Sequence, residues 1–364
     1  MKTVLIYLPN LNCGGAESVT VRLANYLAGN GYSVKLITSI GGGPLEEILD
    51  SRIEYLCLNL KNQWQTILKM PSVIKRIKPD VIFTTMKESC FIMIVAKYVA
   101  CSNARMVIRE ANTVSLQLKE ENKITQRVKN YLIAMSYRFA DKIIALSDEI
   151  KVDLVNSFHL SKEIDVIPNP IGFDKMEKAI MSPLGHDALR DNGTLKLVTV
   201  ARFYPQKNHL FMVNALASYI NKNPNVKWFL VGDGPLKNEI QERIEYLGIS
   251  RNVVFLGFQK NPLAIVNACD VFVLPSLYEG FSNALLEAAA LNKKILVSDA
   301  QTTSVAFLNK LNVGSCYVNN DIDDFCMKLE SEACAIGDPS VSSRMRREYS
   351  EEAVFGSYSK AMFE

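Results

Sequence analysis

The chain has 364 residues, more than one hydrophobic core usually supports, so its length predicts two domains. Hydrophobic residues make up 48% and charged residues 22%, as in an ordinary globular protein, and a net charge of +3 is too small to indicate a nucleic-acid partner. Eight cysteines are scattered without a C-x-x-C pair or a Cys/His cluster, which argues against structural zinc and is typical of reduced thiols in a cytoplasmic protein.

The first residues, MKTVLIYLPNLNCGG, lead from a short apolar run straight into a glycine-rich turn. A signal peptide needs a longer apolar core and a small-residue cleavage site, so we expect a first β-strand here. No apolar stretch approaches the roughly 20 residues of a spanning helix, and the best candidate, CFIMIVAKYVAC, is interrupted by Lys97. We therefore expect a soluble, cytoplasmic protein that at most lies on a membrane surface.

Short β-branched runs alternate with helical patterns through the first half of the chain. They predict strands at residues 3–8, 33–38, 53–58, 80–85, 105–109, 142–146 and 164–167. Helical periodicity falls between most of them, notably at Glu17–Gly29, Ile67–Lys78 and Lys123–Ala140. Buried strands separated by helices indicate a parallel sheet that is covered on both faces.

The stretch IPNPIGFD ends this first series, because Pro168 and Pro170 forbid a continuous helix or a central strand. A polar, turn-rich stretch is expected up to Gly193. Further strands are predicted in LKLVTVA, VKWFLVG, NVVFLGF, CDVFVLP and KKILVSD. The pattern predicts two doubly wound α/β domains, residues 1–170 and 171–345, and a C-terminal helix at 346–364 that returns toward the first domain.

In doubly wound sheets, ligands bind beyond the carboxyl ends of the strands, so the loops after strands are candidate sites. The first such loop, NLNCGGAES, places Gly14 and Gly15 before a helix, where free N–H groups can hold an anion. A simple chain turn is the alternative. The dinucleotide fingerprint G-x-G-x-x-G is absent, which argues against a nicotinamide enzyme.

Two loops in the second half carry cations or glycines. In ARFYPQKNHL, Arg202 and Lys207 precede a helix, and a guanidinium with an ammonium suits a diphosphate, although a solvated basic turn is the alternative. In LVGDGPLKNEI, Gly232 and Gly234 either approach a ligand or only form the turn before the next helix.

The stretch LYEGFSNALLEAAALNKKILVSDA carries two glutamates, Glu279 and Glu287. The residues between them predict a loop that enters a helix with Ser282 as its N-cap. Eight residues along a helix rotate by about 80°, so Glu279 in the loop and Glu287 in the helix would face different parts of one elongated ligand. Glu287 lies among alanines and leucines, where a solvated surface charge is a weak explanation.

Together these motifs resemble the retaining glycosyltransferases of family 4, which have the GT-B fold. The resemblance covers essentially the whole chain and runs through GGAE (14–17), IPNP (167–170), ARFYPQKN (201–208), VGDGP (231–235) and LYEGFSNALLEAAAL (277–291). The last motif, with its paired glutamates, is the most specific. The resemblance implies two Rossmann-like domains with a cleft between them, the first on the acceptor side and the second binding a nucleotide-sugar.

The resemblance also assigns roles to residues. Arg202 and Lys207 would bind the donor diphosphate and Glu279 the transferred sugar, and these three are the predicted catalytic residues. Glu287 would accept hydrogen bonds from the ribose. The other implied donor-binding residues are Gly14, Gly15, Gly232, Gly280, Phe281, Ser282 and Asn283. Cations and helix N-termini would stabilise the leaving phosphate in place of a metal, so no cofactor is expected. The acidic segment DIDD (Asp321–Asp324) is expected to cap a late helix and not to bind a metal.

The chain departs from the family pattern in one place. Many members carry a histidine that touches the transferred sugar after the strand matching MVIREANT, but here the chain reads Arg109-Glu110-Ala111-Asn112. Glu110 or Asn112 is expected to take over that contact, or Glu110 only pairs with Arg109. This departure leaves the identity of the donor sugar open.

The stretch LKEENKITQRVKNYLIAMSYRFADK predicts a basic amphipathic helix that can lie on an anionic membrane surface. A solvated helix that packs its apolar side on the sheet is an equal alternative. The residues concerned are Lys119, Lys123, Arg127, Lys129, Arg138 and Lys142, with Ile124, Val128, Leu132 and Ile133.

The resemblance implies transfer of a hexose or N-acetylhexosamine from a UDP-sugar to a saccharide on undecaprenyl diphosphate, at the inner face of the cell membrane. Such a reaction belongs to the synthesis of O-antigen, capsule or other surface polysaccharide. The alternatives are a GT-B sugar-nucleotide epimerase, which needs no acceptor, and a non-catalytic nucleotide-sugar-binding protein.

Overall fold

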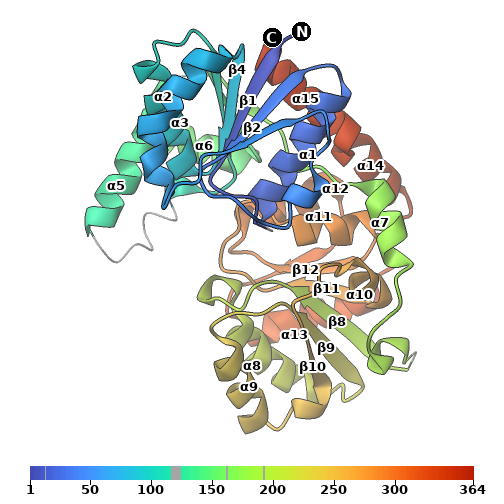
Figure 1. Cartoon of the computed structure of the whole chain (residues 1–364). Helices are drawn as coiled ribbons and strands as arrows, with labels where there is room; N and C mark the ends of the chain where they lie inside the picture. The colour runs from blue at the N-terminus through green and yellow to red at the C-terminus, as the bar shows by residue number, and fades with distance from the viewer. Residues whose placement is uncertain (13, 116–123, 161–162, 192) are drawn as a thin grey trace. The chain divides into compact units, whose positions relative to one another are not determined.

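A computed structural model describes residues 1–12, 14–115, 124–160, 163–191 and 193–364. The chain forms two compact units (Figure 1), one made of residues 1–170 and 351–364 and the other of residues 171–350. In place of the single helix expected at 346–364, the structure has α14 (Ser340–Tyr349) and α15 (Glu351–Phe363). They are separate because Ser350 is extended (φ −62°, ψ 155°) and forms a parallel β-bridge with Ile171.

The N-terminal unit is built on a parallel sheet of seven strands in the order β3-β2-β1-β4-β5-β6-β7. The chain fills one side of β1 first and then continues on the other side from β4, so β1 and β4 mark a topological switch point. The strands are β1 (Thr3–Leu8), β2 (Ser33–Thr38), β3 (Glu54–Cys57), β4 (Val81–Thr85), β5 (Arg105–Glu110), β6 (Lys142–Ala145) and β7 (Ile164–Val166).

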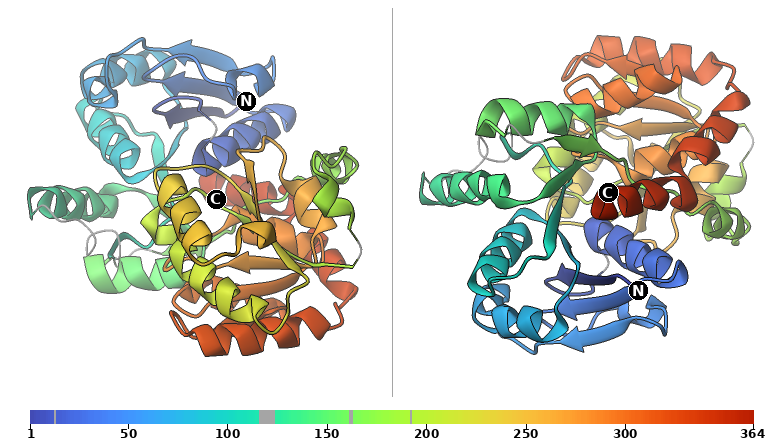
Figure 2. Two further views of the ribbon diagram at one scale, coloured as in Figure 1. Left: turned by 90° about the horizontal axis from the view of Figure 1, so that it is seen from below. Right: turned by 90° about the horizontal axis from the view of Figure 1, so that it is seen from above.

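Helices cover both faces of this sheet (Figure 2), as the strand β1 illustrates. Its residues Val4, Ile6 and Leu8 pack in a cluster with side chains of α1 and α15. Tyr7 points to the other face, where its hydroxyl lies 3.4 Å from the Thr66 hydroxyl of α2. Side chains alternate between faces along a strand, so a continuous apolar run fills two layers of core.

The described helices of this unit are α1 (Gly15–Gly29), α2 (Thr66–Ile77), α3 (Lys87–Val99), α5 (Ile124–Met135), α6 (Asp148–Phe158) and α15 (Glu351–Phe363), with short 3-10 turns η1 (Glu46–Ile48), η2 (Gln63–Gln65) and η3 (Ser136–Phe139). The terminal helix α15 is part of this core. Phe363 stacks on Tyr32 with ring centroids 4.5 Å apart, and Tyr358 is fully buried. The predicted helix at 123–140 becomes α5 and η3, and Lys119 and Lys123 lie outside the described residues.

The C-terminal unit has a parallel sheet of six strands in the order β10-β9-β8-β11-β12-β13. Its switch point lies between β8 and β11. The strands are β8 (Leu195–Val200), β9 (Val226–Val231), β10 (Val253–Gly257), β11 (Val271–Leu274), β12 (Lys294–Ser298) and β13 (Ser315–Tyr317). The last strand was not expected from the sequence, because Ser-Cys-Tyr is not a β-branched apolar run.

The C-terminal unit also buries both faces of its sheet. Val198 and Phe272 pack toward α10, α11, α12 and α14, while their neighbours Leu197 and Val271 pack toward α8, α9 and α13. The helices are α7 (Phe173–Ile180), α8 (His209–Ile220), α9 (Lys237–Tyr246), α10 (Leu263–Ala268), α11 (Asn283–Ala290), α12 (Thr302–Leu311), α13 (Ile322–Cys334) and α14 (Ser340–Tyr349), with η4 (Asp187–Arg190), η5 (Pro205–Lys207) and η6 (Ser250–Asn252).

The stretch between Pro170 and Gly193 differs from the expectation of turns alone. Helix α7 lies in it, and Phe173 and Met176 are buried in the core of the C-terminal unit. Three residues apart on a helix, these two side chains share a face, so two apolar residues are enough to hold a short helix in an otherwise polar segment.

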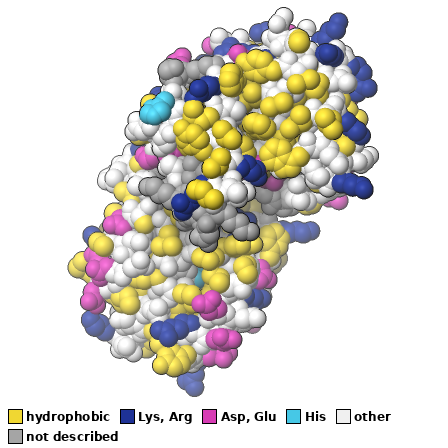
Figure 3. Space-filling view, turned by 90° about the vertical axis from the view of Figure 1, so that its left-hand side faces the viewer, with side chains coloured by type: hydrophobic (Ala, Val, Ile, Leu, Met, Phe, Trp, Pro, Cys, Tyr) yellow, Lys and Arg dark blue, Asp and Glu magenta, His cyan; other side chains and the backbone are white. Residues whose placement is uncertain are grey.

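Within the described ranges, no helix is both long enough and apolar enough to cross a bilayer. Apolar side chains nevertheless reach the surface. Figure 3 shows a face of the molecule on which they gather with lysines and arginines set among them.

Candidate functional site

Two loops that follow adjacent strands of the C-terminal sheet carry the three predicted catalytic residues. Residues 201–208 follow β8, and residues 275–282 follow β11. These strands pair in parallel, with Leu197 opposite Val271 and Val198 opposite Phe272, so both loops leave the sheet at its carboxyl edge. This is the switch point, where loops diverge and a ligand can enter.

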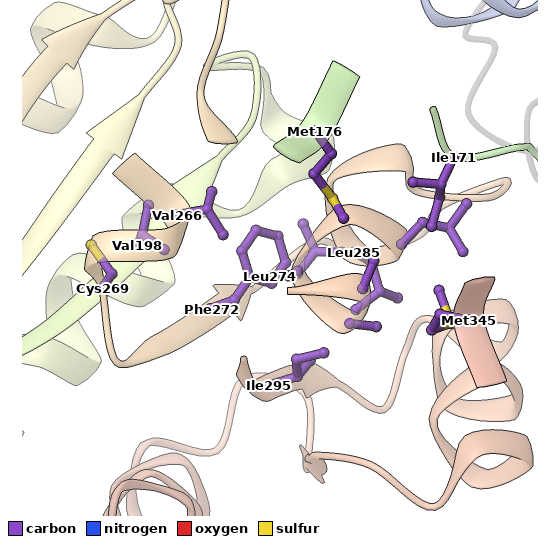
Figure 4. Packing of buried hydrophobic residues seen from close by; sticks show 14 of the residues in the cluster. Ile171, Met176, Val198, Val266, Cys269, Phe272, Leu274, Leu285, Ile295 and Met345 are labelled. Atoms are coloured by element: carbon purple, nitrogen blue, oxygen red, sulfur yellow. The ribbon is translucent and has the colours of Figure 1, made fainter. Parts of the chain in front are cut away.

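The packed core beneath the loops holds them in place. Figure 4 shows Val198, Phe272, Leu274 and Ile295 of three strands in the same hydrophobic cluster as Leu285, which comes from α11. All five side chains are at most 3% exposed. Because a close-packed core transmits small shifts, the loop positions are fixed by these strands and by α11.

The loop after β8 turns tightly before α8. Phe203 is fully buried, Pro205–Lys207 form the 3-10 turn η5, and Asn208 adopts a left-handed conformation (φ 52°). Arg202 is exposed, and its guanidinium lies 5.2 Å from the centre of the Tyr204 ring. No carboxylate of the described residues forms an ion pair with Arg202, so its charge is available to an anionic ligand.

The two glycines of the loop after β9 support the loop after β8. Gly232 has φ +145°, and a Cβ there would overlap the carbonyl oxygen of Ala201. A Cβ at Gly234 would lie 2.6 Å from the carbonyl oxygen of Phe203. Close approach of two backbones explains both glycines, and it places the VGDGP loop beneath the residues that flank Arg202.

Lys207 and Glu279, 72 positions apart in sequence, form an ion pair. The Glu279 Oε1 atom accepts a hydrogen bond from the Lys207 ammonium and another, 2.8 Å long, from the Ser276 hydroxyl. The side chains of Lys207 and Glu279 are 15% and 9% exposed. Among the described residues no donor contacts Oε2, so that oxygen is left for a ligand hydroxyl.

Two further hydrogen bonds join the same loops. The Leu277 N–H donates to the Gln206 carbonyl over 2.8 Å, and the Gln206 side-chain amide donates to the Tyr278 carbonyl over 2.8 Å. Sequence reasoning named neither Gln206 nor Ser276. No sequence pattern marks them, because their partners become neighbours only when β8 and β11 pair.

Helix α11 begins as predicted. Ser282 is its N-cap, with its hydroxyl oxygen 3.3 Å from the Leu285 backbone nitrogen. The Phe281 ring is partly buried and packs edge-on against Phe307 with centroids 5.9 Å apart. Glu287 lies in the second turn of α11 and is half-buried, so Glu279 in the loop and Glu287 in the helix occupy the positions expected for them.

His209, the first residue of α8, is buried beside Lys207. Its ring packs edge-on against Phe203 and stacks near Trp228, and neither ring nitrogen has a hydrogen-bond partner among the described residues. Burial, with a smaller contribution from the Lys207 charge, lowers the pKa of His209 to about 3. The imidazole is therefore neutral at any ordinary pH and adds no positive charge to the site.

In the N-terminal unit, the glycine loop follows β1 and Gly15 is the first residue of α1. Gly14 is the N-cap and has no side chain to accept from the helix. A Cβ at Gly14 would overlap the carboxylate of Glu17, which lies in the first turn. The free N–H groups of this helix therefore already have an anionic neighbour, which any ligand phosphate would displace or avoid.

Glu110 and Arg109, at the end of β5, do not pair with each other. Glu110 is 2% exposed and accepts hydrogen bonds from the Ala111 N–H (2.9 Å), the Asn112 N–H (3.0 Å) and the Tyr137 hydroxyl (2.6 Å). Burial raises the pKa of Glu110, although these hydrogen bonds oppose the rise. The alternative of a Glu110–Arg109 pair is wrong, because consecutive strand residues point to opposite faces.

The buried guanidinium of Arg109 instead joins three segments. It donates to the Thr85 hydroxyl (3.0 Å), the Asn169 amide oxygen (2.5 Å) and the Tyr358 hydroxyl (3.0 Å). Asn112 is exposed, so of the two candidate sugar contacts it is the one whose side chain reaches solvent.

No group of three or more His, Cys, Asp or Glu side chains in the described ranges is arranged to hold a metal ion. The DIDD segment caps a helix, as predicted. The Asp321 carboxylate accepts a hydrogen bond of 2.9 Å from the Asp324 N–H at the start of α13.

Comparison with known families matches both halves of the chain. Residues 13–175 match the model described as "Glycosyltransferase Family 4", and residues 186–347 match "Glycosyl transferases group 1". Together these matches include every predicted site residue of both units.

Two curated relatives are similar over most of their length. The N-acetylgalactosamine-N,N'-diacetylbacillosaminyl-diphospho-undecaprenol 4-alpha-N-acetylgalactosaminyltransferase of Campylobacter jejuni is 28% identical, over 82% of this chain and 81% of that protein. The UDP-Gal:alpha-D-GlcNAc-diphosphoundecaprenol alpha-1,3-galactosyltransferase of Escherichia coli is 25% identical, over 86% of this chain and 81% of that protein. Among solved structures, Anabaena HepE in complex with UDP matches with a TM-score of 0.77 at 16% sequence identity. The match covers 100% of this chain and 99% of the HepE chain, which establishes a common fold.

Proposed function

The chain belongs to the family-4 glycosyltransferases and has the GT-B fold, and from that premise we propose that it transfers a hexose or N-acetylhexosamine from a UDP-sugar to a lipid-linked saccharide. The observation that carries this proposal is the Lys207–Glu279 pair. It joins the loop expected to bind the diphosphate to the loop expected to bind the transferred sugar, at the switch point of the sheet.

The diphosphate would lie against the loop after β8. Arg202 is exposed and can offer its planar guanidinium to phosphate oxygens. Lys207 has three donors and uses one on Glu279, so it can contact the diphosphate while it keeps that pair. These two cations would then stabilise the negative charge that develops on the leaving phosphate.

The two glutamates would hold the two sugars of the donor. Oε1 of Glu279 is occupied by Lys207 and Ser276, so Oε2 would accept from a hydroxyl of the transferred sugar. Glu287, in the second turn of α11, would accept from the ribose. Gly280, Ser282 and Asn283 would offer backbone or side-chain groups between them, and Asn112 is the candidate sugar contact of the N-terminal unit. We take retention of configuration from the family.

We propose that this transfer needs no metal, because Arg202 and Lys207 would stabilise the charge that develops on the leaving phosphate. Activity should then survive saturating EDTA. Complete loss on chelation, with recovery on adding Mg²⁺ or Mn²⁺, would contradict this part of the proposal.

The acceptor is inferred from the relatives. Both act on saccharides attached to diphospho-undecaprenol, as their names state, and we propose the same class of acceptor here, in surface-polysaccharide synthesis. Cytoplasmic location is also part of the proposal. It is supported by the seven described cysteines, all free thiols, as expected in a reducing compartment.

Incubation with UDP-sugars, with and without a lipid-diphosphate saccharide, tests the proposal. We expect a new glycosidic product only when donor and acceptor are both present. An isomerised UDP-sugar in the absence of acceptor would favour a GT-B epimerase. Binding of UDP-sugars without turnover under any condition would favour a non-catalytic nucleotide-sugar-binding protein.

A further inference from the structure

The loop that follows β5 begins at a buried carboxylate. Glu110, the last residue of β5, is 2% exposed. Its Oε1 atom accepts hydrogen bonds from two successive backbone N–H groups, those of Ala111 (2.9 Å) and Asn112 (3.0 Å). Both residues lie outside regular secondary structure, so Glu110 supplies the partner that a strand or helix would otherwise provide. The backbone of the loop therefore curves around one carboxylate oxygen.

A buried tyrosine holds the other oxygen of Glu110. The Tyr137 hydroxyl donates to Oε2 over 2.6 Å, and Tyr137 is fully buried in η3, which packs against α3. Burial and the neighbouring Glu110 charge raise the pKa of Tyr137 well above its ordinary value, so the hydroxyl keeps its proton and remains a donor. With both oxygens engaged inside the protein, Glu110 could reach a ligand only by giving up these hydrogen bonds.

Asn112 is the exposed residue of this loop. Its side-chain amide forms no hydrogen bond with the part of the chain that the structure describes. The loop is anchored again just beyond it, because Val114 is 1% exposed and the Ser115 N–H donates to the Asp153 carboxylate over 3.1 Å. A side-chain amide has both donors and an acceptor, so an amide held in one place can distinguish the orientations of a sugar hydroxyl.

We propose that Glu110 and Tyr137 are positioning residues that hold Asn112 in place to contact the transferred sugar. Glu110 stands where the family pattern has a sugar-contacting histidine, but it acts through Asn112 and not on the sugar. Side chains that fix a contacting residue by buried hydrogen bonds are what a precise site requires. This assignment rests on the proposed function, because it takes a UDP-sugar as the donor, and it deepens that function by naming the residues that would select the sugar.

Hydrogen exchange at the backbone amides tests the positioning without any ligand. Glu110→Ala removes the acceptor of both N–H groups, so exchange at Ala111 and Asn112 should accelerate by about one to two decades. Glu110→Gln keeps an amide oxygen in the place of Oε1, so exchange in this variant should stay close to that of the parent. Tyr137→Phe removes the hydrogen bond to Oε2 alone and should give an intermediate rate.

Tyr358→Phe is a matched control for Tyr137→Phe. Tyr358 is also fully buried, and its hydroxyl accepts a hydrogen bond of 3.0 Å from Arg109, the residue before Glu110. Consecutive strand residues point to opposite faces, so both substitutions remove a buried hydroxyl beside the end of β5, but only Tyr137→Phe removes a partner of Glu110. Exchange at the Asn112 amide should therefore be unchanged in Tyr358→Phe.

Titration of UDP and of UDP-sugars measures the sugar contact without turnover. UDP-glucose and UDP-galactose, and their N-acetylated counterparts, give a ratio of affinities between epimers for each variant. Asn112→Ala should change this ratio by about twofold to tenfold, as expected for one lost hydrogen bond. Glu110→Ala and Tyr137→Phe should change it in the same direction, whereas Glu110→Gln and Tyr358→Phe should not. The affinity for free UDP should be the same in all of them, because its proposed contacts lie in the C-terminal unit.

Three results overturn the assignment. The first is an Asn112→Ala variant that keeps the epimer ratio of the parent. The second is a Glu110→Gln variant that loses affinity for UDP-sugars while Asn112→Ala does not, because Glu110 would then contact the sugar directly. The third is an equal effect of Tyr137→Phe and Tyr358→Phe on the ratio and on the exchange rates, which is what a purely structural role predicts.

The test remains decisive if the alanine variant of Glu110 does not fold. Glu110→Gln and the two Tyr→Phe variants then carry it, and matching thermal unfolding curves show that these three are folded. If the epimer ratios follow the expected order but no acceptor ever receives the sugar, the positioning role holds and the proposed transfer does not. If transfer is found and the ratios do not change, the proposed function holds and the positioning role does not.

Discussion

Replacing Glu279 with glutamine should separate the binding of the nucleotide from the transfer of the sugar. In the structure Lys207 pairs with Glu279, and we propose that Lys207 also binds the diphosphate. Glutamine keeps the shape and the contact with Ser276 but removes the charge that competes for the ammonium. UDP affinity should then be unchanged or higher, while transfer falls because the acceptor for the sugar hydroxyl is weaker.

Lys207→Ala should behave differently, because it removes the ammonium itself. A charge-assisted hydrogen bond contributes roughly 1.5–3 kcal/mol, so UDP affinity should fall by about one to two decades. Transfer should fall by about 10²–10³ or more, as for a lost donor at a developing charge. Isothermal titration of UDP and initial rates measure the two quantities on the same preparations.

The strength of the pair follows from its burial. Two unit charges about 4 Å apart attract by about 4 kcal/mol at an effective dielectric constant of 20. Desolvation offsets part of that attraction for side chains that are only 15% and 9% exposed. A coupling of about 1–3 kcal/mol is therefore expected in a double-mutant cycle of urea unfolding with Lys207→Ala and Glu279→Gln.

The exposed pair of Arg346 and Glu177 provides a matched control, since its side chains are 52% and 59% exposed. A double-mutant cycle of this control pair should give a coupling energy of about 1 kcal/mol or less. The reasoning is refuted if the Lys207–Glu279 cycle shows no more coupling than this control. It is also refuted if Glu279→Gln weakens UDP binding as much as Lys207→Ala does, because Glu279 would then contact the nucleotide.

Three further outcomes are expected. Glu287→Gln should weaken UDP by about one to two decades in calorimetric titration, because it removes a charged acceptor from the ribose; unchanged affinity would place Glu287 outside the site. The folded-state pKa of His209 lies below its unfolded value, so stability falls as pH drops from about 6.5 toward 3. The free energy of unfolding, measured in urea, should fall by about 2 kcal/mol between pH 7.5 and pH 5, and the His209→Leu variant should lack this loss. Arg109→Met should cost about 3 kcal/mol in urea unfolding because it removes three buried hydrogen bonds of the guanidinium, whereas the exposed control Arg251→Met should stay within about 0.5 kcal/mol.

The sequence by itself determined the fold class. Every strand predicted from an apolar run is present within two residues of its expected bounds, because buried parallel strands are apolar along their whole length. The helix start at Ser282 was also readable, since a cap and its N–H partner lie within one turn. Two elements were missed. The residues of β13, Ser-Cys-Tyr, are not β-branched, and α7 buries only two apolar side chains, Phe173 and Met176, so neither shows a usable pattern.

The partners of the site residues were decided only by the tertiary structure. The pairing of Lys207 with Glu279 depends on β8 and β11 becoming neighbours, and no local pattern encodes strand order. In the same way, the sequence showed that residues 124–135 form an amphipathic helix, but not which side of it would be covered. That choice is made by the elements that pack on α5, and it leaves Val128 and Leu132 in solvent because the helix buries Ile133 and Ala134 instead.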